Sequence, residues 1–154
     1  MEQNNSFHDL LLKAERFCSY QERCRFELQQ KLKEWGADED STSKVIASLE
    51  ENEYMNDERF AKLFASGKFR IKRWGKNKIR AELRMKKIPD AFIKKGLDAI
   101  DESEYKKTIQ HLIGRKAKEL KGQTTRDEKA KIVRYLLSKG FESSLVFANL
   151  KLET

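Results

Sequence analysis

Cysteine and histidine side chains are the first places to look for chemistry, and this chain has few of them. Its 154 residues include two cysteines, Cys18 and Cys24, and two histidines, His8 and His111, which lie far apart. The cysteines lack the two-residue spacing that zinc and redox sites use. We therefore expect no metal and no cofactor, and we interpret both cysteines as half-buried thiols on helices.

Acidic and glycine-rich motifs give no better indication of catalysis. No phosphate-binding loop of the GxxxxGK[ST] or GxGxxG type is present. The acidic run at 38–40 is better explained as a helix cap than as a two-metal nuclease site, and neither histidine can be paired with a nucleophile. The chain is predicted not to be an enzyme, and a nuclease would have to show cleavage that depends on a divalent metal.

The densest charged feature is the segment 68–87, which holds ten basic residues and a single acid, Glu82. Residues 1–53 carry 7 basic and 12 acidic side chains, residues 54–103 carry 14 and 7, and residues 104–154 carry 12 and 6. Like charges this crowded repel one another unless a partner neutralises them. The segment therefore indicates contact with a polyanion or an acidic protein surface, and a plain solubilising surface is the alternative.

The residues predicted to make that contact are the basic side chains between positions 68 and 84. They are Lys68, Arg70, Lys72, Arg73, Lys76, Lys78, Arg80 and Arg84. Two aromatic residues, Phe69 and Trp74, lie among them, and such interleaving suits single-stranded nucleic acid, whose bases stack on aromatic rings. Trp74 precedes Gly75, so it is equally well explained as a core residue at the end of a helix.

The elements that must position these residues are predicted to be helices. Apolar residues recur at i, i+3, i+4 and i+7, glycine is scarce, and Pro89 is the single proline. No apolar run approaches the roughly 18 residues of a membrane span, and the first residues carry no leader pattern. We expect an all-α, cytoplasmic protein with no membrane partner.

Apolar positions repeat with a period of just over 50 residues. Leu28, Ile79 and Ile132 are 51 and 53 residues apart, and the leucines four positions after each of them follow the same offsets. Such a period is typical of tandem repeats, whose units stack to share a core. The predicted domains are three three-helix repeats at 1–53, 54–103 and 104–154, forming an elongated, curved body.

Helix signals within the repeats agree with this period. Asn56 is predicted to cap a helix, Pro89 to bend the chain, and Thr125 with Glu128 to form a capping box whose helix ends at Gly140. The helices predicted with explicit bounds are 9–18, 25–35, 43–52 and 78–86.

Three short motifs follow one another at a fixed order and spacing. They are E-L-x-x-K-L-x-x-x-G at 27–36, D-E-R-F-A at 57–61 and G-x-x-x-I-R-x-E-L at 75–83. In this order they resemble the RecX family of regulatory proteins, and the likeness runs from about residue 10 to residue 150.

The resemblance implies a partner that the residues alone do not name. RecX proteins bind the bacterial recombinase RecA, lie along the groove of its filament on DNA, and limit strand exchange and co-protease activity. The implied function is a monomeric, non-catalytic regulator that binds the RecA filament and, weakly by itself, single- or double-stranded DNA. The basic residues at 68–84, aided by Lys116, Lys118 and Lys121, are expected to contact acidic filament surface and DNA phosphates.

Two other interpretations stay open. The chain could be a sequence-tolerant DNA-binding protein that needs no recombinase, in which case its DNA affinity should fall steeply with salt. It could also be a helix-turn-helix repressor, although the candidate recognition helices at 44–52 and 91–99 lack clusters of base-reading side chains.

Two positions depart from the family pattern. Cys24 stands where the family usually has serine, which predicts a weaker N-cap and no capping box with Glu27. Lys87 replaces the usual glycine before the bend at Pro89, which predicts an altered turn there.

Overall fold

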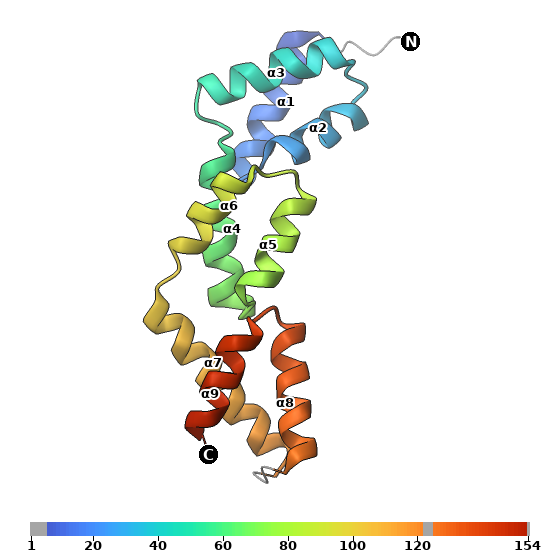
Figure 1. Ribbon diagram of the computed structural model, residues 1–154. Helices are drawn as coiled ribbons and strands as arrows, with labels where there is room; N and C mark the ends of the chain where they lie inside the picture. Colours follow the sequence, from blue (N-terminus) through green and yellow to red (C-terminus); the bar gives the residue numbers. More distant parts are fainter. Residues whose placement is uncertain (1–5, 122–124, 154) are drawn as a thin grey trace. The chain divides into compact units, whose positions relative to one another are not determined.

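The computed structural model describes residues 6–121 and 125–153. The expectation about a leader concerns the first five residues, which lie outside the described part. The described residues form nine α-helices and no strand, which confirms the predicted all-α fold (Figure 1). None of the described helices is both long and apolar enough to pass through a bilayer. The helices are α1 (Phe7–Tyr20), α2 (Arg25–Glu34), α3 (Glu39–Glu51), α4 (Asp57–Lys72), α5 (Lys76–Met85), α6 (Asp90–Asp98), α7 (Glu102–Glu119), α8 (Arg126–Ser138) and α9 (Ser143–Glu153).

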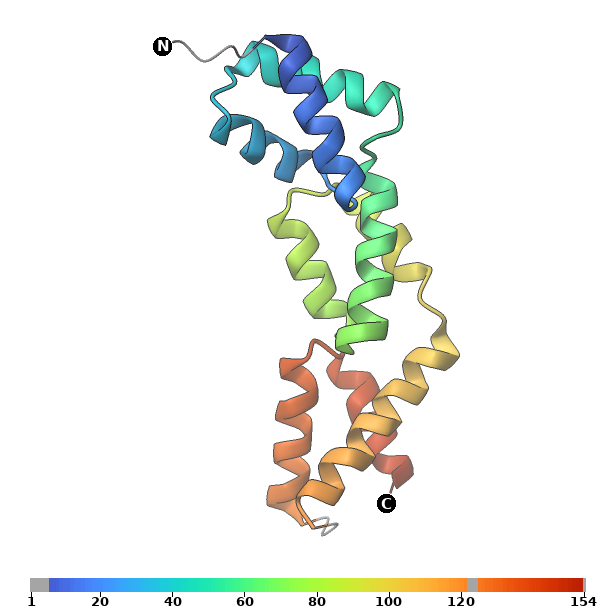
Figure 2. The same cartoon turned by 180° about the vertical axis from the view of Figure 1, so that it is seen from behind.

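The helices belong to two compact units, and the division between them falls inside α4, inside α5 and inside α6. The N-terminal unit ends at Leu63 and also includes Leu83–Lys95, whereas the C-terminal unit consists of Phe64–Glu82 and the residues from Gly96 onward. In the N-terminal unit α1, α2 and α3 pack against one another, and in the C-terminal unit α7, α8 and α9 do so (Figures 1 and 2). The repeat boundaries predicted from the sequence stay a prediction.

Each unit is held together by the apolar positions that carry the sequence repeat. Leu28 and Leu32 of α2 are fully buried in the N-terminal unit, where they pack with Leu10 and Leu49. The equivalent residues of the C-terminal unit that are buried to the same degree are Ile79, Ile132 and Leu136. Because burial of one such side chain contributes about 1.5–3 kcal/mol, this repeated pattern accounts for much of the packing of the helices.

Polar side chains at the helix starts explain where several helices begin. Asp38 Oδ1 accepts a hydrogen bond from the Ser41 N–H at 2.8 Å, which confirms the cap predicted in the acidic run and starts α3 earlier than expected. Thr125 Oγ1 accepts from the Glu128 N–H at 3.2 Å, and Glu128 Oε2 accepts from the Thr125 N–H at 3.5 Å. The predicted capping box of α8 is therefore present.

The start of α2 corrects an expectation from the sequence. The Cys24 N–H donates to Glu27 Oε1 at 3.2 Å, and the Glu27 N–H points back at the Cys24 sulfur, so a capping box does form. The expected loss of the box was wrong, because the hydrogen bond to the Glu27 carboxylate comes from the backbone N–H of residue 24 and does not depend on its side chain. Sulfur supplies the other half as a weak acceptor.

A residue with positive φ follows the second helix of all three sequence repeats. Gly36, Lys87 and Gly140 have φ of 87°, 61° and 98°. After each of them, the next N–H donates to the carbonyl five residues earlier, as Ile88 does to Leu83 at 3.2 Å. This hydrogen bond closes a helix end in the Schellman manner. The turn at Lys87 is thus not altered, and the lysine adopts the conformation of the two glycines.

Replacement of Lys87 by glycine is expected to stabilise the protein. A left-handed conformation costs a non-glycine residue roughly 1–2 kcal/mol, and the extra flexibility of glycine in the unfolded chain offsets part of the gain. We expect Lys87→Gly to raise the free energy of unfolding by about 0.5–1 kcal/mol, measured by thermal denaturation. Lys33→Gly, at an exposed position inside α2, should lower it by about 1 kcal/mol, and a loss of stability in both variants would contradict the account.

Both cysteines are buried thiols, and their chemistry follows from that burial. Cys18 is 8% exposed and Cys24 is not exposed at all, and burial raises the pKa of each thiol to about 11. At pH 8 the native thiols should therefore react with a disulfide reagent roughly a hundred times more slowly than the same thiols in the unfolded chain. Since the unfolded thiols ionise first, stability should fall as the pH rises from about 9 to 11. Fast reaction of native protein at pH 8 would contradict this assignment.

Candidate basic interface

The basic residues predicted from the sequence lie at the end of α4 and along α5. Arg70, Lys72 and Arg73 are exposed at the end of α4, and Ile71 between them is 80% exposed. Lys68, Lys76, Lys78 and Arg80 are partly buried. Arg84 belongs to the N-terminal unit and lies 3.4 Å from Asp90 Oδ1, so its charge already has a partner.

Trp74 brings two of these cations together. The Nζ atoms of Lys68 and Lys78 lie 4.9 Å and 4.5 Å from the centre of its ring, within the range of a cation–π interaction. The half-buried ring also packs edge-on against Phe64, with centroids 6.4 Å apart. Trp74 therefore packs on a neighbour, and part of its ring stays accessible among lysines. A contact with nucleic-acid bases stays a prediction.

Phe69 does not share this accessibility. Its ring is 5% exposed and lies 5.6 Å from that of Tyr105, which in turn lies 5.4 Å from Phe141. The interpretation of Phe69 as part of an aromatic surface for bases is wrong, because the position falls on the buried face of α4.

Two further cations complete a cluster that the sequence did not predict. Lys139 at the end of α8 donates from Nζ to the Lys72 carbonyl at 2.9 Å. Desolvation lowers the pKa of Lys139, and the nearby positive charges of Lys78, Arg73 and Arg115 lower it further. We call Arg73, Lys78, Arg115 and Lys139 the basic cluster. Among the described residues, none of the four has an acidic partner within ion-pair distance.

Two loops of the C-terminal unit hold the cluster in place. The Gly75 N–H donates to the Lys139 carbonyl at 2.7 Å, and the Asn77 N–H donates to the Gly140 carbonyl at 2.9 Å. A Cβ atom on Gly75 would lie 2.3 Å from the Gly140 backbone, so only glycine permits this approach. The contact sets Lys78 beside Lys139 although they are 61 positions apart, which explains why local sequence patterns missed Arg115 and Lys139.

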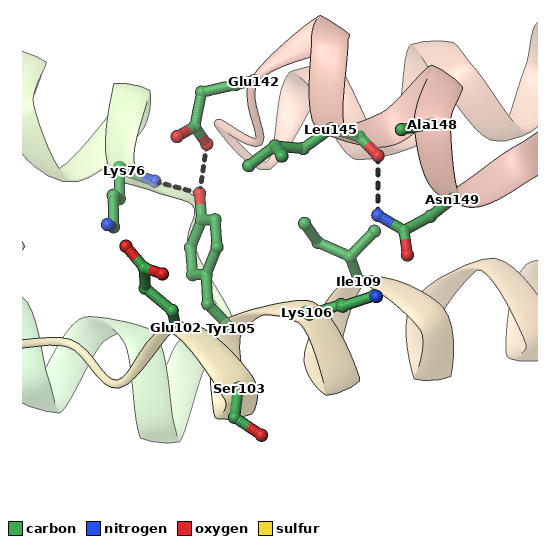
Figure 3. A pocket seen from close by; sticks show the side chains of 10 residues that line it. All are labelled: Lys76, Glu102, Ser103, Tyr105, Lys106, Ile109, Glu142, Leu145, Ala148 and Asn149. Atoms are coloured by element: carbon green, nitrogen blue, oxygen red, sulfur yellow. Dashed lines mark hydrogen bonds between the residues drawn. The ribbon is translucent and has the colours of Figure 1, made fainter.

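A second constellation, around Tyr105, is structural in character. The Tyr105 hydroxyl donates to the Glu142 carboxylate and accepts from the Lys76 N–H at 2.8 Å, which ties α5, α7 and the start of α9 together (Figure 3). Burial, together with the hydrogen bond to Glu142, raises the pKa of Tyr105.

A pocket of about 720 Å³ lies next to Tyr105 in the C-terminal unit. Figure 3 shows basic, acidic and apolar side chains around it, with no one chemistry dominant. The residues that line it are Lys76, Glu102, Ser103, Tyr105, Lys106, Ile109, Glu142, Leu145, Ala148 and Asn149.

The remaining predicted cations are more dispersed. Lys76 Nζ lies 5.1 Å from the centre of the Tyr105 ring, and Arg80 donates to Asn77 Oδ1 at 2.8 Å. Lys116 lies 3.6 Å from Glu119 Oε1, whereas Lys118 and Lys121 are exposed. Within the described part of the chain, no group of three His, Cys, Asp or Glu side chains is placed to hold a metal ion.

Comparison with known proteins identifies the family. The chain is 32% identical over 132 residues to "Regulatory protein RecX" of Chlorobaculum tepidum, an alignment that covers 83% of this chain and 78% of that protein. The chain belongs to the RecX family. Models of the first, second and third three-helix domains of RecX match residues 11–49, 56–97 and 102–148.

Other RecX proteins are similar over different lengths. The protein of that name from Oceanobacillus iheyensis is 24% identical, and the alignment covers 95% of this chain but 54% of the relative, so the chain spans about half of its length. The crystal structure of RecX from Lactobacillus salivarius matches with a TM-score of 0.86 and 23% identity, covering 94% of each chain. A second crystal structure, of regulatory protein RecX, matches with a TM-score of 0.85 and 21% identity, covering 94% of this chain and 73% of the other. These two likenesses support the fold.

Proposed function

We propose that the chain binds the filament of the RecA recombinase in the cytoplasm and inhibits its activity in recombination and DNA repair without catalysing a reaction. The similarity to proteins named Regulatory protein RecX is the observation that carries this proposal. The basic residues between 68 and 80 are the part of the chain that supplies the contact. Arg84 contributes least, because its guanidinium is already paired with Asp90.

Electrostatics supports a contact of this kind. Arg70, Lys72 and Arg73 are exposed, and none of their side chains has an acidic partner among the described residues. A surface of one sign raises the rate of encounter with a surface of the opposite sign, and it discriminates against partners of like charge. The end of α4 therefore suits an acidic surface on the filament, and Ile71 supplies an apolar contact between the cations.

Inhibition needs no chemistry in this mechanism. A monomer that binds along the filament would bridge neighbouring RecA subunits and so change the rate at which the filament grows or disassembles. DNA phosphates beside the bound chain would add a second, salt-dependent contribution to the affinity.

Cosedimentation tests the binding step. RecA filaments assembled on single-stranded DNA with a non-hydrolysable nucleotide should carry the chain into the pellet at a salt concentration at which the same DNA without RecA does not. The alternative function, a DNA-binding protein that needs no recombinase, requires equal retention by DNA alone. That result would exclude recruitment by RecA.

A further inference from the structure

The basic cluster extends beyond the segment assigned to the filament contact, because Arg115 and Lys139 lie outside residues 68–80. Arg73 comes from the loop after α4, Lys78 from α5, Arg115 from α7 and Lys139 from the end of α8, so four elements bring their positive charges to one place. A Cβ atom on Gly140 would lie 2.4 Å from the Lys78 Cβ, and two backbone hydrogen bonds, from Gly75 to Lys139 and from Asn77 to Gly140, join the same two loops. Cations that lie near one another with no acidic partner among the described residues favour a site for an anion.

Resting on the DNA contact of the proposed function, we propose that Arg73, Lys78, Arg115 and Lys139 form a binding site for the phosphodiester backbone of single-stranded DNA. The two arginines match a phosphate group with planar, forked donors, and the two lysines add compact charges. Among the described residues, none of the four is paired with a carboxylate. A phosphate would therefore have no acidic side chain to displace.

The Trp74 ring is the reason that we assign the site to single-stranded rather than duplex DNA. Its half-buried ring lies under the ammonium groups of Lys68 and Lys78. When Lys78 moves to a phosphate, it uncovers part of the ring, on which an unpaired base can stack. A base within a duplex is already stacked. The site thereby combines a charged track with an aromatic platform.

The backbone of Arg73 ends α4 with a positive φ, as that of Lys87 does after α5. Arg73 has φ of 55°, a left-handed conformation in which glycine is not strained. Its N–H donates to the Phe69 carbonyl at 3.0 Å, so the turn fixes the backbone position from which the Arg73 side chain extends. Arginine at this position adds charge to the cluster at the cost of strain.

Salt dependence tests the site directly. We would titrate the full chain, and its Arg115→Gln/Lys139→Gln variant, with a labelled oligothymidylate of about 20 nucleotides at several salt concentrations, following anisotropy. Each phosphate contact contributes about 0.7 to the slope of log affinity against log salt, so loss of two contacts should reduce the slope by about 1.4. The affinity at low salt should fall at least about tenfold.

The matched control removes the same two charges elsewhere. Arg126 and Lys131 are exposed on α8 and lie outside the basic cluster, so Arg126→Gln/Lys131→Gln should leave the slope unchanged. Lys139 also donates to the Lys72 carbonyl, so Lys139→Arg should keep both the slope and the thermal unfolding midpoint. Arg115 is exposed. The single variant Arg115→Gln should therefore reduce the slope by about 0.7 without loss of stability.

Strandedness is tested with Trp74→Leu. This variant should bind the oligothymidylate about tenfold more weakly at an unchanged slope, because it loses stacking and keeps the charges. Its affinity for a duplex of equal length should not change. An equal loss on single strand and duplex would overturn the assignment to single-stranded DNA.

Two further results would overturn the phosphate site, and they are separable from failure of the proposed function. One is no measurable DNA binding by the full chain at low salt; the other is an equal slope for the Arg115→Gln/Lys139→Gln variant and the unmodified chain. If that variant keeps its DNA slope but no longer inhibits RecA, the cluster contacts an acidic protein surface instead. If the slope changes as expected and RecA is not inhibited by any form, the DNA site stands and the proposed function fails.

Discussion

Replacement of Gly75 by alanine is expected to lower the free energy of unfolding of the C-terminal unit by about 3 kcal/mol. The added Cβ would lie 2.3 Å from both Gly140 C and Phe141 N, which are backbone atoms that cannot turn aside. Relief of the overlap would separate the two loops and break the hydrogen bond from the Gly75 N–H to the Lys139 carbonyl at 2.7 Å. For a chain of this size the melting temperature should fall by about 6–12 °C.

Gly140→Ala should be at least as damaging. Gly140 has φ of +98°, and its added Cβ would lie 2.4 Å from the Lys78 Cβ, so strain and overlap act together. Gly67 and Gly114 provide the controls, because a Cβ at either position meets nothing within 4 Å. Alanine at these two helical positions should raise stability by about 0.5–1 kcal/mol. Destabilisation in all four variants to a similar degree would contradict a specific contact between the two loops.

Reversal of the three exposed charges at the end of α4 should strongly reduce the inhibition of RecA. The variant Arg70→Glu/Lys72→Glu/Arg73→Glu turns attraction for an acidic filament surface into repulsion. We expect the half-inhibitory concentration to rise by about 10- to 100-fold, with the larger loss at low salt, where charges are least screened. The readout is the single-stranded-DNA-dependent ATPase of RecA at several concentrations of the chain.

A second triple variant controls for net charge. Arg126→Glu/Lys131→Glu/Arg134→Glu also reverses two arginines and one lysine at exposed positions, and it should retain inhibition within about threefold. Thermal unfolding of both variants verifies that the helices persist. Equal inhibition by the α4 variant and the unmodified chain would exclude this surface as the contact.

The helices were predictable because local patterns determine them. The spacing of Leu28, Ile79 and Ile132 indicated both the helical period and the repeat, and all three are buried. The caps at Asp38 and Thr125 were predictable for the same reason, since each depends on a hydrogen bond between residues only three positions apart.

The basic interface was less predictable, because contacts between distant residues assemble it. The run of cations at 68–84 marked α4 and α5, but nothing in the sequence near Lys139 or Arg115 places them beside Lys78. Those neighbours depend on the close approach of Gly75 to Gly140. The prediction that Phe69 is accessible was wrong for the same reason. Its ring is buried beside Tyr105 and Phe141 only when α4 meets α7 and the start of α9.

Lys87 illustrates a limit of reasoning from residue type alone. The replacement of a usual glycine predicted a changed turn, yet φ of 61° and the hydrogen bond from Ile88 to Leu83 show the same turn as at the glycines. The packing of the flanking helices outweighs a local strain of roughly 1–2 kcal/mol. A preference of that size shifts stability without redirecting the backbone.

The ATPase of RecA on single-stranded DNA, measured with increasing amounts of the unmodified chain, tests the central claim most directly. DNA binding by the chain is followed in parallel under the same conditions. The account predicts suppression at concentrations of the chain well below that of RecA, where its own binding to the DNA is too weak to remove the substrate. Two results would contradict a regulator that acts on the filament. One is no suppression at all, and the other is suppression that competition for the DNA fully explains.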